Sequence, residues 1–203
     1  MSIGGPTTTF IPPPGAPDLW RLSVRQYHDM IRSGILTDDD PVELLEGLLV
    51  TKMPRNPPHR VVTRLTRDAL QAILPPGWHV ESQEPITTDA SEPEPDIAVI
   101  RGEPREYRDH HPGPAELALV AEVADSTLDR DRGTKKRIYA RASIPVYWIV
   151  NLGDSCIEVY TDPTGPTENP DYRQRSDHGL SDHVDVVIDG QIVGQLRVAA
   201  LLQ

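Results

Sequence analysis

The 203-residue sequence predicts an α/β protein with a mixed β-sheet, and three observations support this fold class. Predicted helices, judged from apolar spacing and capping residues, occur both before and after a group of strand-like runs. The runs DIAVI and LALVAEVA are short and continuously apolar, as expected of strands buried on both faces of a sheet. Glu-Gly and Asp-Gly pairs between other apolar runs indicate hairpins, so antiparallel pairing is expected as well.

The first third of the chain contains an arm, a helix and a hairpin. Residues 1–18 are rich in Pro, Gly and Thr, which predicts a poorly ordered arm. Ser23 can cap a helix that runs to about Ser33 and stops at Gly34. In the following VELLEGLLVTKM, a Glu-Gly pair separates two apolar runs, which predicts a tight hairpin turn.

A second helix and three strands follow the segment RNPPHR. The helix has apolar residues at spacings of three and four, namely Val62, Leu65, Ala69, Leu70 and Ile73. Its end is predicted at the Pro-Pro-Gly of residues 75–77. The segment WHVESQEPITT is expected to form one strand, and DIAVI and LALVAEVA two more.

The second half of the chain is expected to contain one more helix and several strands. The helix spans about residues 130–142, and Ser126, Thr127 or Asp129 can cap it. PVYWIVN and CIEVYTD are strands separated by a Gly-Asp turn, and VDVVIDGQIV is a hairpin. Residues 162–183 are polar and Pro-rich, which predicts a loop with at most one short strand.

Composition favours a single cytoplasmic domain, residues 19–203, after the arm. Cys156 is the only cysteine, which excludes an internal disulfide framework or a cysteine-based metal cage, and we expect it to pack as a small hydrophobe. The first residues lack the basic and apolar regions of a secretory signal. No apolar run approaches the roughly 20 residues of a membrane span.

The formal net charge of −11 argues against a protein that coats nucleic acid electrostatically. The charge is uneven, however, because residues 130–141 carry six bases and a single acid, whereas residues 151–203 carry nine acids and three bases. A basic patch on an acidic body permits a polyanionic substrate at one face. The alternative is that these bases form a solvated helix face.

Two carboxylates stand at unusual positions in the predicted buried strands. Asp96 opens the run DIAVI, and Glu122 lies inside LALVAEVA, where an unpaired charge would be costly. They either form buried ion pairs, with Arg101 or with bases of the next helix, or converge on a divalent cation. That helix offers Lys135 and Lys136, and Lys135 shares a face with Tyr139 four residues later.

An ordered set of motifs resembles a known nuclease family. PEPDIAVI is followed by LALVAEVADSTLDRDRGTKKRIYARASIPVYWIVN, and ELLEGLLVTKMPRNPPHRVV lies upstream. Together they resemble the Uma-type restriction endonuclease family of the PD-(D/E)XK nuclease superfamily, over about residues 20–160. The resemblance implies a restriction-endonuclease-like mixed sheet flanked by helices, with additional hairpins. It also implies a metal-dependent endonuclease that hydrolyses phosphodiester bonds, most often in DNA.

The resemblance also implies roles for individual residues. Asp96 and Glu122 match the two acids that bind Mg²⁺ or Mn²⁺, and the carbonyl of Val123 is a possible further ligand. The superfamily's lysine usually lies two residues after the second acid, where this chain has Ala124. In this family the lysine lies on the following helix, so Lys135 is expected to be the catalytic lysine.

Lys136 is the second candidate for that lysine. Glu43 and His59 match an acid beside the hairpin and a histidine that opens a helix, and either can contact metal, water or phosphate. The alternatives are a solvated strand residue for Glu43 and a capping or packing role for His59. A homodimer is expected, from the family and from the need to cut two strands.

Other functions stay open at this point. They are a nuclease that acts on RNA, and a catalytically silent module on a nuclease fold that binds nucleic acid or protein. No helix-turn-helix, zinc finger or aromatic-basic platform predicts how bases would be read. The aromatic run of residues 147–149 is expected in the core, and His110, His111, Glu92 and Glu94 are expected to be solvated.

Overall fold

A six-stranded mixed sheet forms the centre of the computed structural model, which describes residues 19–37 and 39–203. The strand order is β3-β4-β5-β6-β7-β8, in which β5 and β6 pair in parallel and the other neighbours are antiparallel. The strands are β3 (Trp78–Glu81), β4 (Ile97–Arg101), β5 (Leu117–Ala124), β6 (Val146–Asn151), β7 (Cys156–Pro163) and β8 (Tyr172–Gly179). The predicted α/β class with a mixed sheet is confirmed, whereas the predicted arm lies outside the described residues.

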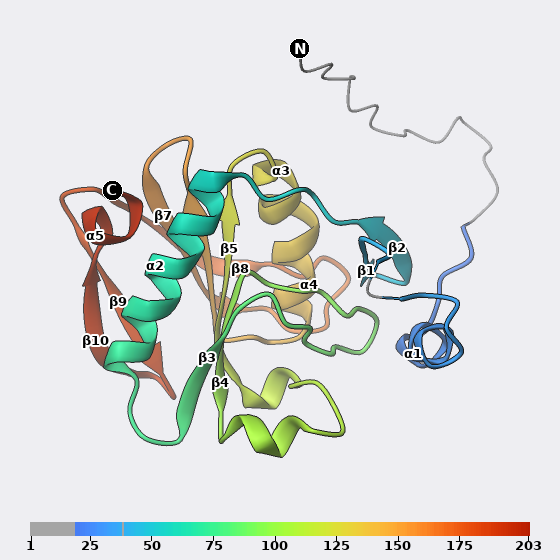
Figure 1. Cartoon of the computed structure of the whole chain (residues 1–203). Coiled ribbons are helices and arrows are strands. Elements are labelled where there is room, and N and C mark those ends of the chain that lie inside the picture. Colours follow the sequence, from blue (N-terminus) through green and yellow to red (C-terminus); the bar gives the residue numbers. More distant parts are fainter. Residues whose placement is uncertain (1–18, 38) are drawn as a thin grey trace, which may run out of the picture.

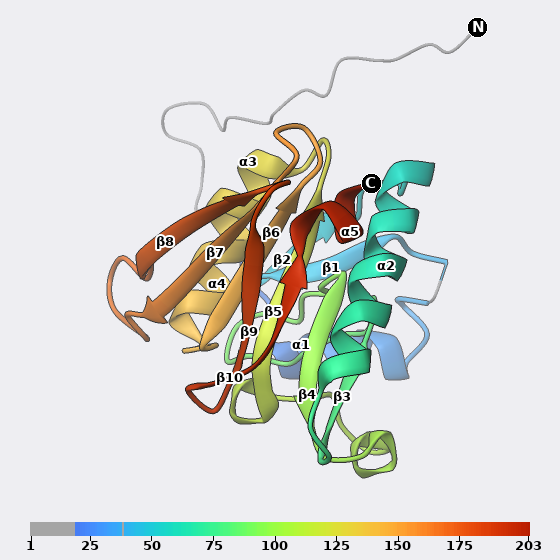
Figure 2. The ribbon, with the colours of Figure 1, turned by 90° about the vertical axis from the view of Figure 1, so that its left-hand side faces the viewer.

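Helices and two hairpins cover both faces of this sheet (Figure 1). One face carries α2 (Pro57–Ile73), α5 (Val198–Leu202) and the hairpin of β9 (His183–Ile188) and β10 (Gln191–Arg197), all in front of the sheet in Figure 2. The opposite side carries α1 (Val24–Arg32), the hairpin of β1 (Val42–Leu45) and β2 (Leu48–Thr51), and one helical stretch over residues 128–141. Two 3₁₀ turns, η1 (Pro104–Tyr107) and η2 (Pro114–Glu116), lie between β4 and β5.

The stretch over residues 128–141 contains a π-helical turn. It consists of α3 (Leu128–Arg130), the π turn η3 (Asp131–Lys135) and α4 (Lys136–Arg141). It is the crossover that joins the parallel strands β5 and β6, which two-residue turns cannot connect. The predicted helix is therefore confirmed, although its hydrogen bonding is irregular where Asp131 and Lys135 lie.

Local signals explain the ends of several elements. The Ser23 side chain accepts a hydrogen bond from the Gln26 backbone N–H, and this capping box starts α1. The β1–β2 turn has positive φ at both central residues, 48° at Glu46 and 79° at Gly47, as a type I′ hairpin requires. The turn between β9 and β10 also has positive φ at both central residues, Asp189 and Gly190. These predicted turns are confirmed.

The strands separate the core into two apolar layers because their side chains alternate. In β6, Trp148 points to the layer under α2, whereas Tyr147 and Ile149 point to the layer under α4. All three are fully buried, which confirms the prediction that this aromatic run belongs to the core. In β4 and β5 the same alternation places Ala98 and Val120 in the layer under α4, so Asp96 and Glu122 fall on that side as well.

The structure corrects three expectations. Residues 162–183 contain the eight-residue strand β8, whose polar sequence reflects its place at the sheet edge, where its central side chains face solvent. The strand expected over WHVESQEPITT ends at Glu81, because Gln83 adopts a positive φ of 63°. Leu65, assigned to the apolar face of α2, is exposed. Cys156 is half-buried at the start of β7.

No helix within the described residues combines the length and apolarity that a membrane crossing would need.

Candidate active site

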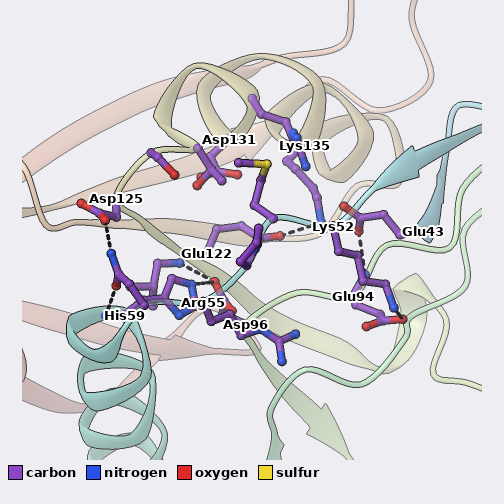
Figure 3. Close-up of a pocket in the computed structure, with 17 residues that line it drawn as sticks. Glu43, Lys52, Arg55, His59, Glu94, Asp96, Glu122, Asp125, Asp131 and Lys135 are labelled. Carbon is purple, nitrogen blue, oxygen red and sulfur yellow. Dashed lines mark hydrogen bonds and ion pairs between the residues drawn. The ribbon is translucent and has the colours of Figure 1, made fainter. Parts of the chain in front are cut away.

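Asp96, directly before β4, and Glu122, inside β5, lie side by side. Ile97 of β4 pairs with Ala121 of β5, and continuing this antiparallel register by one residue brings Asp96 to Glu122. Asp96 Oδ2 accepts a hydrogen bond from the Val123 backbone N–H at 2.9 Å and lies 3.0 Å from His59 Nε2. Both carboxylates are buried and line the same pocket, as Figure 3 shows.

Lys135 reaches this pair of acids from the crossover helix. Its Nζ lies 2.8 Å from Glu43 Oε2 and 3.2 Å from Glu122 Oε1. The hydroxyl of Tyr139, one turn later, donates to Glu122 Oε1 at 2.5 Å. The shared face expected for Lys135 and Tyr139 is therefore confirmed, and both side chains contact Glu122. The ion-pair and metal-site interpretations describe the same cluster, since a lysine pairs with the acid that would bind a metal.

The π turn contributes a further acid that sequence reasoning missed. Asp131 is buried, lines the same pocket, and accepts a hydrogen bond from the Thr127 hydroxyl at 2.6 Å. Asp131 and Lys135 stand at the two ends of the π turn, a feature often found at functional sites. The spacing of four between Asp131 and Lys135 was the available signal, because it matches the spacing of Lys135 and Tyr139.

The concentration of carboxylates perturbs their protonation. Burial, reinforced by the charges of Asp96 and Asp131, raises the pKa of Glu122 to about 8, although Lys135 opposes the shift. Burial likewise raises the pKa of Asp131 to about 6, with Asp96 adding to the shift. Carboxylic acids held partly neutral in one pocket form a site that a cation would stabilise in its charged form.

Neighbouring carboxylates, rather than burial, determine the protonation state of Lys135. Burial alone would lower the pKa of Lys135, but the carboxylates of Glu122 and Glu43 outweigh burial and raise it. Lys135 is therefore an ammonium ion at neutral pH. It can donate hydrogen bonds or stabilise negative charge, and it is a poor proton acceptor.

The donor set fits a hard divalent cation. The carboxylates lining the pocket belong to Glu43, Glu94, Asp96, Glu122, Asp125 and Asp131. Oxygen ligands suit Mg²⁺ and Mn²⁺, and Mg²⁺ usually binds through one or two carboxylates while retaining waters and phosphate oxygens. Across residues 19–37 and 39–203, no three His, Cys, Asp or Glu side chains form a ready-made metal cluster. Asp96 and Glu122 would supply two carboxylates to such a cation.

Glu43 and His59, which were expected to contact metal, water or phosphate, both line the pocket. Glu43 is buried rather than a solvated strand residue, and its Oε2 also accepts a hydrogen bond from the Glu94 backbone N–H at 3.1 Å. His59 lies in the first turn of α2, where its backbone N–H donates to the capping side chain of Asn56. The side chain of Glu43 contacts Lys135, and the side chain of His59 contacts Asp96.

Lys136 does not reach the pocket. Its Nζ lies 2.8 Å from Asp171 and 5.5 Å from the centre of the Tyr160 ring. Neighbouring helix positions point about 100° apart, so only one of the two lysines can face Glu122. Of the two candidates, the structure brings only Lys135 to the acids.

The other bases of residues 130–141 are largely engaged elsewhere. Arg132 pairs with the buried Glu158, and Arg137 pairs with Glu46 at 2.7 Å. Arg130 is the exception, because it lines the pocket and donates to the Thr51 carbonyl at 3.3 Å. The basic run is therefore neither a free phosphate-binding surface nor a simple solvated face.

Residues near the mouth of the pocket add charges of both signs. Lys52 forms an ion pair with Glu94, and Arg55 donates to Gln83 at 2.7 Å. Asp125 accepts a hydrogen bond from the Asn56 amide, as drawn in Figure 3. Glu94 was expected to be solvated but lines the pocket.

Glu92 was also expected to be solvated, and this was wrong. Its side chain is buried, with its Oε2 2.6 Å from His28 Nε2 and 2.7 Å from the Thr87 hydroxyl. His110 and His111 are exposed, as predicted, although His111 lies 4.0 Å from Glu92. Arg101, considered as a partner for the site acids, instead pairs with Asp189 at 2.7 Å.

Comparisons with known proteins identify the family of this chain and a solved structure of similar fold. Residues 24–187 match the model of the Uma2 family, described as "Putative restriction endonuclease". The fold is similar to a crystal structure from Anabaena variabilis ATCC 29413, described as a "putative nuclease belonging to DUF820", with a TM-score of 0.64 and 14% sequence identity. That match covers 84% of this chain and 94% of the other chain. No curated protein matches this chain significantly.

Proposed function

Because this chain belongs to the Uma2 restriction endonuclease family, we propose that it is a metal-dependent endonuclease that hydrolyses phosphodiester bonds in DNA. The observation that carries the proposal is the convergence of Asp96, Glu122 and Lys135 in one pocket. Two acids can bind a divalent cation and a lysine can stabilise negative charge, which are functions that assist phosphoryl hydrolysis. Neither the family nor the fold specifies the substrate, so DNA is part of the proposal.

Asp96 and Glu122 would hold Mg²⁺ or Mn²⁺, with the Val123 carbonyl as a further ligand. When bound, such a cation would lower the pKa of a coordinated water and polarise a phosphate oxygen. Val123 N–H and His59 fix the orientation of Asp96 through hydrogen bonds to its Oδ2. Tyr139 does the same for Glu122, and such outer contacts tune ligand basicity.

Lys135 supplies positive charge beside Glu122, because neighbouring carboxylates hold its pKa above the ordinary value. Its ammonium would stabilise charge on the phosphate in the transition state or orient the attacking water. Glu43 accepts a second hydrogen bond of Lys135, beside its contact with Glu122, and so positions the ammonium group. Since the raised pKa of Lys135 keeps it protonated, it would not serve as the general base.

The proposal is tested by incubating the protein with supercoiled plasmid and Mg²⁺ or Mn²⁺, with and without EDTA. We expect metal-dependent nicking that is lost in Asp96→Ala and Lys135→Ala and retained in Lys136→Ala. Single-stranded DNA and RNA are run in parallel, because cleavage of RNA alone would replace DNA as the substrate. Binding without cleavage of any of these would support a catalytically silent module instead.

We also propose that the active form is a homodimer, because cutting both strands of a duplex takes two sites. Light scattering coupled to size exclusion gives the mass directly, to be compared with the 22.5 kDa of one chain. A monomer at the concentration at which plasmid is cut would contradict the dimer and leave the nuclease proposal standing.

A further inference from the structure

The outer face of α2 combines exposed aliphatic and basic side chains. Positions 57, 60, 61, 64 and 65 follow a spacing of three and four, so they share one face of the helix. Val61 is 57% exposed and Leu65 37% exposed, although a surface helix normally turns its aliphatic residues toward the core. With Pro57, Arg60 and Arg64, these two residues line a shallow groove.

This groove adjoins the active-site pocket at the start of α2, where Asn56 and His59 line the pocket and Pro57 and Arg60 line the groove. His59, in the first turn of α2, lines the pocket from the inner face, and Asn56 caps the helix beside it. At 1.5 Å per residue, Leu65 lies about 9 Å along the axis from His59. A polymer with one phosphate in the pocket would therefore pass along this helix.

The arginines along this path differ from those of the crossover helix. No carboxylate pairs with Arg55, Arg60 or Arg130 among the described residues, whereas Arg132 and Arg137 are held by buried or half-buried acids. Arg64 pairs with Asp68 at 2.8 Å, but both side chains are at least half exposed. A surface pair of this kind contributes little and is readily exchanged for another anion.

We propose that Arg130 and Arg55 at the pocket mouth and Arg60 and Arg64 on α2 bind the sugar-phosphate backbone of the nucleic acid substrate. The inference rests on the proposed nuclease function and assigns its substrate-binding surface. The arginines contact phosphates, and Val61 and Leu65 contact the apolar faces of the sugars. Contacts of this kind position a duplex without reading its sequence.

The surface also accounts for how a protein with a net charge of −11 can hold a polyanion. Helix α2 carries three arginines and a single acid, Asp68, so its outer face is a local basic strip on an acidic protein. Local charge rather than net charge steers a charged ligand within a Debye length of about 8 Å at physiological ionic strength.

The test measures binding of a fluorescent 20-base-pair duplex in EDTA, where no cleavage occurs, at several salt concentrations. We compare the wild type with Arg60→Ala/Arg64→Ala and with Arg173→Ala, an exposed arginine on β8 that pairs with Asp162 much as Arg64 pairs with Asp68. Removing two phosphate contacts should weaken binding by about tenfold or more and reduce the slope of log K against log salt by about 2. Arg173→Ala should bind like the wild type.

A second pair of measurements separates this surface from the active site. Bis(p-nitrophenyl) phosphate reaches only the pocket, so the double variant should lose far more activity on DNA than on this small ester. Equal losses on both substrates, or unchanged duplex affinity and salt slope, would overturn the proposed surface. If the wild type binds duplex through Arg60 and Arg64 but cleaves neither substrate, the nuclease function fails and the surface stands.

Substituting Val61 and Leu65 tests independently whether nucleic acid or a second copy of the chain covers the outer face of α2. Val61→Ser/Leu65→Ser should weaken duplex binding without changing the mass measured by light scattering. A dimer that becomes monomeric in this variant, with duplex affinity unchanged, would identify the face as a contact between copies and refute the nucleic-acid assignment.

Discussion

Lys135 and Glu43 are 92 positions apart in the sequence and form a buried ion pair, with Nζ 2.8 Å from Oε2. The pair joins the crossover helix to the β1–β2 hairpin across the mouth of the strands that carry Asp96 and Glu122. It holds the ammonium group against Glu122 on its other side. The hairpin is thus part of the candidate site, because it supplies Glu43 to the pocket.

Lys135→Ala is expected to reduce plasmid cleavage by about 100-fold or more, the typical effect of removing one group that stabilises transition-state charge. Lys136→Ala is the matched control, because Lys136 is the next residue in the chain but its side chain pairs with Asp171 outside the pocket. Initial rates of nicking measure both. Equal losses in the two variants would mean that the lysines act through helix stability or general charge rather than through a position beside Glu122.

Glu43→Gln should destabilise the fold, because it leaves the buried Lys135 with one fewer acid. Breaking a buried ion pair by removing one partner typically costs about 3–5 kcal/mol. Urea denaturation at pH 7 measures the loss. Glu43→Gln/Lys135→Met removes the ammonium group as well, and Glu122, which then loses Lys135, can take up a proton because burial already raises its pKa to about 8. This double variant should therefore be more stable than Glu43→Gln alone. If it is instead less stable, the pair is not the source of the effect.

Tyr139→Phe should weaken metal binding, because Glu122 loses the hydroxyl that orients it. Removing such an outer-shell contact typically costs about 10–100-fold in metal affinity. Titration calorimetry with Mn²⁺ provides the affinity. Tyr172→Phe is the control, since that buried hydroxyl donates to the Ile144 carbonyl at 2.9 Å, away from the pocket. Each variant should lose a similar stability of about 1 kcal/mol, so only the metal affinity distinguishes them.

Glu158→Gln should reduce the sensitivity of the fold to acid. Burial of Glu158 would raise its pKa, but hydrogen bonds from Arg132, Tyr160 and Asn151 outweigh burial, and the pKa lies below the ordinary value of 4.5. A carboxylate with a depressed pKa stabilises the folded state above its ordinary pKa, and this contribution is lost as pH falls through the folded-state value. Below pH 4.5, urea midpoints should fall more steeply for the wild type than for Glu158→Gln. Parallel curves would assign the acid sensitivity to other carboxylates.

Several features of this protein follow from short stretches of sequence. The Glu-Gly and Asp-Gly turns, the cap at Ser23 and the buried runs of β4 and β5 depend on φ preferences, local hydrogen bonds and alternation, which are properties of neighbouring residues. The importance of Asp96 and Glu122 could also be inferred from the local sequence. Each was conspicuous because a charge at a buried strand position needs a partner.

Other features depended on contacts between distant segments. Choosing between Lys135 and Lys136 required knowing which side of the helix faces Glu122. The local sequence does not reveal this, because the π turn changes the direction in which each side chain points. Glu92 is buried because α1 brings His28 to it from 64 positions away, and β8 exists because β7 offers a free edge to a polar segment. Local patterns therefore determined the elements and the two strand acids. Tertiary packing decided which charges meet, because burial and pairing energies arise only when separate elements share one low-dielectric space.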